Sequence, residues 1–374
     1  MKTLTGKINN FEKKVIGKLT TKKKLFGHKK KMIYLSKGDD LPKGYLAIIS
    51  SNKEYDNNFM NVISEVENIN ELHDDDIVEI DTNGKISILY DVNSSSNTLF
   101  ITERCNSNCI MCPQPPISYD DKLFNDNLTF ISLLPKETKK LLITGGEPTL
   151  IGDKLFILIS AINQKIPKAS ITLLSNGINF SKLEYAKRLS QVIKKQDIVV
   201  DIPLHSDIDT IHNQIARVNS FYKTLNGIYN LAKYNVRIGI RVVVHKLNYN
   251  RLPELSEYIY SNFPFVYQVA FVQIEPIGFS KDNLADLWID PYDYNDKLEE
   301  AVMNLHNRNL QVTIFNSQLC VLPKNLRRFA VQSISDWKNI YIDECVNCIL
   351  KTECAGFFSA SKDIHSNKIK AIQK

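Results

Sequence analysis

The spacing of apolar residues changes near residue 95. Before that point, short runs of β-forming residues predict strands: GYLAIIS (44–50), DIVEID (76–81) and KISILYD (85–91). Asn83-Gly84 predicts a tight turn between the last two runs. A polar stretch, DVNSSSN (91–97), has the composition of a linker. The pattern therefore predicts a small β-rich unit over residues 1–95.

After residue 96, strand-like runs alternate with amphipathic helical stretches. The strand candidates are TLFITE (98–103), KLLITG (140–145), ITLLSN (171–176), DIVVDIPL (197–204), RIGIRVVVH (237–245) and VYQVAFVQIEP (266–276). Helical candidates between them include 181–194, 221–234 and 251–262. This alternation is typical of an α/β fold with a parallel sheet, and six strands fit a partial (β/α)6 barrel over 96–309. Periodicity alone does not separate such a barrel from a doubly wound sheet. Residues 310–374 are expected to be loops.

Composition places the chain among soluble globular proteins. Hydrophobic residues make up 43% and charged residues 24% of the 374 residues. No apolar run is long enough to cross a membrane, and the start MKTLTGKINN lacks the apolar region of a signal peptide. We therefore expect a cytoplasmic protein with reduced thiols and no membrane partner.

Positive charge gathers at the N-terminus. Residues 1–31 hold eleven lysines, no arginine and one acidic residue, Glu12. Such a run can bind an acidic peptide, a nucleic acid or a membrane surface, or it can be solvated without a partner. Nucleic-acid sites use arginines and interleaved aromatic residues, which this run lacks. We favour a solvated terminus and expect no nucleic-acid partner.

Three cysteines follow the first strand of the alternating region, in TERCNSNCIMCPQPP (102–116). Cys105, Cys109 and Cys112 have the spacing C-x3-C-x2-C. A reducing compartment argues against disulfides, and the chain's seven cysteines are an odd number. A structural zinc ion normally needs four ligands, whereas three thiolates can hold three irons of a four-iron cluster and leave one iron open.

Polar residues follow the next two predicted strands. TGGEPTL brings Gly145 and Gly146, which let a backbone approach closely, and Glu147, whose carboxylate can bind an ammonium group. LLSNG brings Ser175 and Asn176. Active sites of βα folds lie at the carboxyl ends of their strands. We therefore expect these residues and the cysteines at one site.

C-x3-C-x2-C followed by GGEP resembles the radical S-adenosylmethionine (SAM) superfamily, over residues 97 to about 280. The resemblance implies that Cys105, Cys109 and Cys112 bind a [4Fe–4S] cluster whose open iron holds SAM. It also implies that Glu147 and the Gly146 backbone bind the amino group of SAM. An external donor would supply the electron that cleaves SAM to a 5′-deoxyadenosyl radical. The full set of candidate SAM contacts is Gly145, Gly146, Glu147, Ser175, Asn176 and Ser206. The two serines and Asn176 are equally good capping residues.

Four more cysteines lie near the C-terminus. Cys345, Cys348 and Cys354 have the spacing C-x2-C-x5-C, and Cys320 precedes them. Four cysteines satisfy a structural zinc ion. The block also resembles the SPASM and twitch extensions of peptide-modifying radical SAM enzymes, which implies one auxiliary iron–sulfur cluster held by these four residues. Residues 310–374 would then be an auxiliary-cluster extension.

A narrower resemblance rests on TERCNSNCIMCPQPP, LCVLPKNLRRFA, SISDWKNIY and CAGFFSA. Together they resemble the radical SAM maturases of the His-Xaa-Ser repeat peptide system. This resemblance implies a ribosomally made precursor peptide as substrate and a partner maturase. Two alternatives stay open: a radical SAM enzyme acting on RNA or a small molecule, and a non-catalytic iron–sulfur or zinc protein acting as sensor or scaffold.

Overall fold

The computed structural model describes residues 2–9, 11–23, 29–36, 38, 42–52, 61–95, 97–117, 123–193, 197–335 and 338–373. Asp336 and Trp337 of the SISDWKNIY motif lie outside these residues. The chain divides into two compact units. The first comprises Met1–Ile101, Lys122–Leu142 and Ile157–Ser170, and the second comprises Thr102–Asp121, Ile143–Phe156 and Ile171–Lys374. The three-part division with limits near residues 95 and 310 stays a prediction.

The β-rich start of the chain is a small barrel. Its strands are β1 (Thr3–Thr5), β2 (Lys7–Asn9), β3 (Val15–Thr20), β4 (Met32–Ser36), β5 (Ala47–Ser50), β6 (Val62–Ser64), β7 (Ile77–Ile80) and β8 (Lys85–Tyr90). They form one sheet in the order β1-β8-β7-β3-β4-β5-β6-β2. Buried aliphatic side chains fill it, including Leu19, Ile33 and Ile49. The predicted β-rich region is confirmed. The sequence runs indicated only three of these eight strands.

Gly6 closes this barrel. Strands β1 and β2 are separated by Gly6 alone, yet β1 pairs with β8 at one end of the sheet and β2 pairs with β6 at the other. A Cβ atom on Gly6 would lie 2.6 Å from the Ser64 carbonyl oxygen, so glycine is needed where the strand changes partner. The Asn83-Gly84 turn also forms as predicted, because Gly84 adopts a φ of 82°.

A parallel sheet follows the barrel. Its strands are β9 (Asn97–Phe100), β10 (Lys140–Thr144), β11 (Ser170–Leu174), β12 (Asp197–Pro203), β13 (Arg237–Val244), β14 (Gln268–Gln273), β15 (Gln311–Phe315) and β16 (Ala330–Val331). They lie side by side in chain order, and β12 to β16 pair in parallel. Continuous burial along β12 explains why its sequence reads as an apolar run. The predicted partial barrel is confirmed.

The sheet has two strands more than the six that the sequence predicted. Strand β15 pairs with β14, and β16 pairs with β15, within the region expected to be loops. QVTIF alternates polar and apolar residues, as a strand does, but it is short and stands alone among loop-forming residues. Strand β16 has only two residues, which is too few for any periodicity. The expectation of loops from residue 310 is wrong at these two strands.

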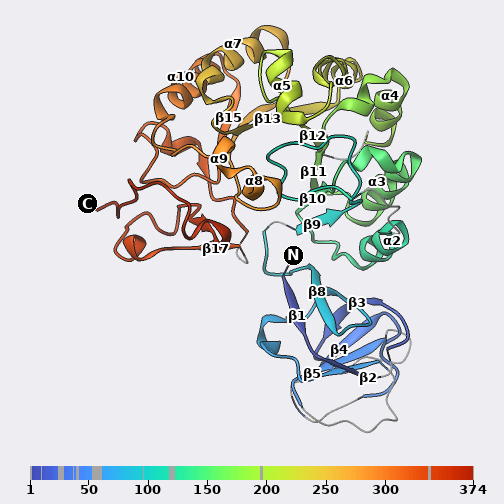
Figure 1. Cartoon of the computed structure of the whole chain (residues 1–374). Coiled ribbons are helices and arrows are strands. Elements are labelled where there is room, and N and C mark those ends of the chain that lie inside the picture. The colour runs from blue at the N-terminus through green and yellow to red at the C-terminus, as the bar shows by residue number, and fades with distance from the viewer. Residues whose placement is uncertain are drawn as a thin grey trace. The chain divides into compact units, whose positions relative to one another are not determined.

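Helices connect the strands. They are α2 (Leu123–Leu133), α3 (Asp153–Lys165), α4 (Leu183–Val192), α5 (Asp209–Ala216), α6 (Phe221–Lys233), α7 (Leu252–Asn262), α8 (Phe279–Asp282), α9 (Leu284–Leu287) and α10 (Asn295–Asn307). Helices α4, α6, α7 and α10 lie on the outer side of the curved sheet (Figure 1). In α6, Phe221, Leu225 and Ile228 repeat at helical spacing and are buried.

The C-terminal region also contains the two-stranded ladder of β17 (Asn339–Ile340) and β18 (Phe357–Phe358).

None of the helices in the described ranges is long and apolar enough to span a bilayer. All seven cysteines fall within those ranges, and no disulfide joins any of them.

Candidate active site

The first three cysteines lie on a loop held from two sides. On one side, Asn108 N donates to Ala216 O at 3.2 Å and Ile110 N donates to Ile215 O at 2.9 Å, at the end of α5. On the other side, the segment 279–283 binds the cysteine loop through three contacts. These are Phe279 N to Cys112 O at 2.9 Å, Ser280 Oγ to Met111 O at 2.6 Å and Asn283 Nδ2 to Ile110 O at 3.2 Å. The loop is therefore held by five hydrogen bonds to other protein groups.

The three thiols are half-buried, and their charges influence one another. Burial raises the pKa of the Cys105 thiol to about 11 and that of Cys109 to about 12, and neighbouring cysteines add to both shifts. Burial also raises the pKa of Cys112. Thiolates are the form that binds iron, so three such groups close together need a cationic partner to ionise at neutral pH. An iron–sulfur cluster supplies that positive charge.

Gly145 and Gly146 bring the end of β10 against the start of the cysteine loop. Gly146 N donates to Thr102 O at 2.7 Å, and Glu147 N donates to Arg104 O at 2.8 Å. A Cβ atom on Gly145 would lie 2.5 Å from Thr102 O, and one on Gly146 would collide with Arg104 O. The glycines are thus required for this backbone packing. Their contact with SAM stays a prediction.

Glu147 is completely buried behind the cysteine loop. Its Oε1 accepts hydrogen bonds from Thr149 N at 3.0 Å, Thr149 Oγ1 at 2.5 Å and Ser175 Oγ at 2.9 Å. Its Oε2 accepts one, from Asn176 N at 2.7 Å. Burial raises the pKa of Glu147, and these donors oppose the shift. Oε2 therefore carries fewer hydrogen bonds than Oε1.

Asn176 connects Glu147 to the cysteine loop. Its side-chain Nδ2 donates to Asn106 Oδ1 at 2.7 Å and to Ser107 Oγ at 3.3 Å, while its backbone N binds Glu147. Ser175 Oγ accepts from Gly177 N at 3.2 Å, which shapes the turn after β11. The structure therefore brings Glu147, Ser175 and Asn176 to the cysteines, as the strand-end argument predicts.

Ser206 has the contacts of a turn residue. Its Oγ accepts from Ile208 N at 3.1 Å and lies 3.3 Å from Asp207 Oδ1, just before α5 begins. Asp207 in turn pairs with Arg251 through two guanidinium contacts. Binding of SAM by Ser206 stays a prediction.

Two buried histidines follow the next strand ends. His205 comes after β12 and His245 after β13, and both are at most 2% exposed. Burial lowers the pKa of His205 well below its usual value and that of His245 to about 4, so both are neutral at pH 7. In the described part of the chain, His205 Nδ1 and His245 Nε2 have no hydrogen-bond partner.

Sequence reasoning missed several residues that build the site. Thr149 donates two hydrogen bonds to Glu147, Asn106 and Ser107 accept from Asn176, and Ser280 and Asn283 hold the cysteine loop. Asn106 and Ser107 lie between the cysteines in CNSNC, and a polar pair at that position was the only available signal. The partners of Ser280 and Asn283 are about 170 residues away in sequence, so no local pattern marks them.

Residues 99–259 match the family model of the radical SAM superfamily. This segment is a radical SAM domain. The family implies a [4Fe–4S] cluster together with SAM as cofactors.

Relatives of the radical SAM domain carry different names. The chain is 24% identical over 218 residues to a probable GTP 3′,8-cyclase of Sulfurisphaera tokodaii, covering 57% of this chain and 64% of that protein. It is 32% identical over 149 residues to the GTP 3′,8-cyclase of Aliarcobacter butzleri, covering 38% and 44%. A solved structure, native anSMEcpe with bound AdoMet and Cp18Cys peptide, shows 20% identity and a TM-score of 0.44, covering 58% and 62%.

The chain spans less than two thirds of each of these proteins. Neither curated relative is named as a peptide maturase. The resemblance to His-Xaa-Ser maturases therefore stays a prediction.

Beyond the radical SAM domain, the four remaining cysteines meet at one small cavity. Cys320, Cys345, Cys348 and Cys354 line it together with Leu319, Tyr341 and Phe357. Backbone N–H groups point at these sulfurs: Leu319 N to Cys354 Sγ at 3.4 Å and Ile372 N to Cys348 Sγ at 3.4 Å. Such hydrogen bonds stabilise thiolates and are common around metal-bound sulfur. The folded chain thus assembles a four-thiol site from residues up to 34 positions apart.

The spacing of the sulfurs bears on which metal centre fits. Four thiolates around one zinc ion at about 2.3 Å place their sulfurs about 3.8 Å apart. Among the described residues, the only group of three ligand atoms from His, Cys, Asp and Glu within 4.8 Å of one another is His73, Asp76 and Asp91. Neither cysteine set is therefore as tight as a zinc site. Three thiols fit a [4Fe–4S] cluster that has one open iron, and four thiols fit either a zinc ion or an iron–sulfur cluster.

A short segment after β14 joins the two cysteine sites. Gly278 packs against the Pro113 and Cys112 carbonyls, and Phe279 and Ser280 bind the cysteine loop. On its other side, Glu275 pairs with Lys338 at 2.7 Å, and Lys338 lies 5.8 Å from the Phe358 ring centre. The segment 275–280 therefore contacts both the first site and the C-terminal region that carries the second.

Proposed function

We propose that this chain is a radical SAM enzyme that modifies a ribosomally made peptide in a reducing compartment, the cytoplasm. When bound, the [4Fe–4S] cluster and SAM supply a 5′-deoxyadenosyl radical, made with one electron from an external donor, that abstracts hydrogen from the substrate. The preformed cysteine loop beside the buried Glu147 network is the observation that supports a catalytic centre. A sensor or scaffold protein has no need of a carboxylate held in that position.

In this proposal Cys105, Cys109 and Cys112 hold the cluster. Glu147 orients the strand ends around SAM and keeps Oε2 available for its ammonium group. Asn176 fixes the distance between Glu147 and the cysteine loop. Gly145, Gly146, Ser175 and Ser206 complete the proposed surface for SAM.

The second cysteine site supports the peptide assignment. The residues that line it belong to the segments that carry the narrower resemblance: Leu319 and Cys320 to LCVLPKNLRRFA, and Cys354 and Phe357 to CAGFFSA. Those segments therefore lie together at one four-cysteine cavity, which supports the narrower resemblance. We propose one auxiliary iron–sulfur cluster held by Cys320, Cys345, Cys348 and Cys354, a precursor peptide as substrate, and a partner maturase.

The named relatives motivate a second candidate, radical chemistry on a purine nucleoside triphosphate. Two curated relatives are GTP 3′,8-cyclases, at 24% and 32% identity. Both alignments leave a third or more of the relative unmatched, so the substrate of those proteins does not carry over directly.

The two candidates are separated by supplying each substrate to the same reduced, reconstituted protein. We expect 5′-deoxyadenosine to form, and to form faster with a His-Xaa-Ser precursor peptide, whose mass changes, than with GTP. A new nucleotide product with no change in the peptide would favour the cyclase candidate. Absence of 5′-deoxyadenosine under every condition would refute the catalytic proposal.

A further inference from the structure

A basic pocket lies in the first unit. It has a volume of ≈ 930 Å³ and is lined by Lys18, Lys30, Lys31, Lys136 and Lys165, against two acidic residues, Asp75 and Glu137. We call it the lysine pocket. Its walls come from β3, the turn before β4, the end of β8, the loop after α2 and the last residue of α3.

The lysines of this pocket lie close enough to repel one another. The pKa of Lys165 is lowered, first by burial and then by the charges of Lys136, Lys18 and Lys31. Lys165 Nζ donates to the Ser132 carbonyl oxygen at 2.6 Å, which is a neutral partner. Lys18 pairs with Asp75 at 2.7 Å. Five cations against two acids leave the pocket positively charged, so a bound anion would relieve this repulsion.

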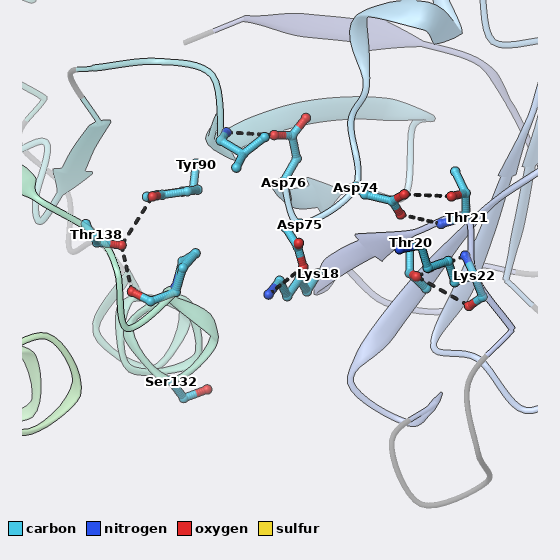
Figure 2. A network of polar contacts seen from close by, with 12 residues as sticks. Lys18, Thr20, Thr21, Lys22, Asp74, Asp75, Asp76, Tyr90, Ser132 and Thr138 are labelled. Atoms are coloured by element: carbon cyan, nitrogen blue, oxygen red, sulfur yellow. Dashed lines mark hydrogen bonds and ion pairs between the residues drawn. The ribbon is translucent and has the colours of Figure 1, made fainter.

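The walls of the pocket are fixed by hydrogen bonds. Figure 2 shows Tyr90, Thr138 and Ser132 on one side and Lys18 with Asp75 on the other. The Tyr90 and Thr138 hydroxyl oxygens are 3.2 Å apart, which joins the end of β8 to the loop after α2. Buried Asp76 accepts from Val92 N at 2.9 Å and from His73 N at 2.8 Å. The pocket is therefore preformed, which lowers the entropic cost of binding.

The chemistry of the lining favours a peptide over a nucleic acid. Single-stranded nucleic acids bind where exposed aromatic rings stack on bases. The one aromatic residue of this lining, Tyr90, is only 7% exposed and has no open ring face to offer. Apolar side chains lie between the lysines instead, among them Met32, Leu133 and Val92, which is 42% exposed. Such a surface suits a chain that alternates carboxylates with apolar residues.

We propose that the lysine pocket binds an acidic segment of the substrate peptide, separate from the residues that are modified. This inference rests on the proposed function, because it supplies the docking site for the same peptide. It also changes the interpretation of the N-terminal lysines. Lys18, Lys30 and Lys31 line a built cavity, whereas a solvated terminus had been expected.

The test uses the full, reconstituted chain and a fluorescein-labelled peptide that alternates Glu with Ala and Leu. Fluorescence anisotropy measures its binding. The variant Lys31→Glu with Lys136→Glu reverses two exposed charges of the pocket. The matched control, Lys7→Glu with Lys85→Glu, makes the same change in net charge at exposed positions of the barrel outside the pocket.

We expect the pocket variant to bind the peptide about tenfold more weakly and the control variant less than about twofold more weakly. Binding should also weaken as salt rises. A peptide with Gln in place of Glu should bind poorly. Circular dichroism checks that both variants are folded, and formation of 5′-deoxyadenosine without peptide should be equal in all three proteins.

Equal binding by the pocket variant and the control would overturn the inference, as would equal binding of the Gln peptide. Tighter binding of a single-stranded RNA oligonucleotide, lost in the pocket variant, would assign the pocket to nucleic acid and overturn it too. Failure of the proposed function gives a different result: no 5′-deoxyadenosine in any of the proteins, whatever the peptide affinity.

Discussion

Glu147 shows how a single residue of the site can carry two roles. Its carboxylate accepts four hydrogen bonds from the ends of β10 and β11, so it organises the loops around the cysteines. The same carboxylate is the group that the family resemblance assigns to the amino group of SAM. Substitutions that separate shape from charge can therefore distinguish the two roles.

Glu147→Gln keeps the volume of the side chain. Its amide NH2 group, however, faces N–H and O–H groups that donate to the carboxylate in the wild type. We expect SAM to bind at least about tenfold more weakly while the iron content stays unchanged, because one buried hydrogen bond and the charge are lost. Glu147→Ala leaves the donors on Thr149, Ser175 and Asn176 unsatisfied. It should lower the free energy of unfolding by about 2–4 kcal/mol.

Equilibrium dialysis of SAM, iron analysis and urea unfolding measure these effects. Glu254→Gln, on the exposed side of α7, is the control. Loss of iron in Glu147→Gln would make Glu147 a structural residue, and unchanged SAM affinity would remove it from the cofactor site.

At the residue scale, sequence predicted the groups with distinctive chemistry. The seven cysteines and GGEP stand out because few other residue types have the same chemistry. Asn106, Ser107 and Thr149 do not stand out, because asparagine, serine and threonine occur in every loop. Their part in the site depends on which strand ends become neighbours, and that is set by the sheet.

At the scale of elements, the cysteine loop depends on the segment 279–283. Ser280 is completely buried, and its hydroxyl donates to Met111 O. Asn283 binds Ile110 O and also accepts from Arg217 Nη2 at 3.0 Å, so the same side chain reaches the end of α5. Two short helical turns thus hold a metal-binding loop about 170 residues earlier in the chain.

Removing these two side chains should loosen the loop without unfolding the chain. In Ser280→Ala with Asn283→Ala, two hydrogen bonds to the loop are lost, at about 1 kcal/mol each. We expect iron of the first site to be released to a chelator several-fold faster than in the wild type. The absorbance of a ferrous chelator complex follows the release. Ser190→Ala, at a half-buried serine of α4 whose hydroxyl donates to Lys187 O in the same helix, is the control. Equal release rates in the double variant and the wild type would contradict this role.

Element prediction worked where periodicity was long. The six strands of the predicted barrel all form, and α4, α6 and α7 fall within the predicted helical stretches. Strands β1, β2 and β6 have three residues each, and β16 has two. Such short strands are stabilised by the neighbours they pair with, so their own sequence carries little signal.

At the scale of the whole molecule, the chain has two separate thiol sites joined by the segment 275–280. The spacing of the cysteines in the sequence indicates both sites. Six of the seven cysteines fall in two short runs, and Cys320 stands apart. That Cys320 joins the C-terminal set was an inference from ligand number, and the cavity now supports it. Four thiols satisfy either a zinc ion or an iron–sulfur cluster, and metal analysis distinguishes the two.

The two sites should lose their iron independently. Reconstituted wild-type protein should hold about eight irons per chain. In Cys345→Ser with Cys348→Ser we expect about four irons, with 5′-deoxyadenosine still formed and peptide modification lost. Cys109→Ser with Cys112→Ser should also keep about four irons but form no 5′-deoxyadenosine.

Metal analysis and product analysis are made on the same samples. Four irons and one zinc in the wild type would show that the second site is a zinc site. Loss of all iron in either variant would show that the two sites depend on each other.

The closure of the N-terminal barrel by Gly6 limits how that unit can recognise a peptide. The two end strands of the sheet, β1 and β2, are three residues long and are joined through Gly6, so little edge is open to an incoming strand. A peptide that binds this unit is then recognised through its side chains and not through main-chain hydrogen bonds. Direction and handedness of the ligand's backbone should matter little, and an acidic peptide of D-amino acids should compete with its L-form.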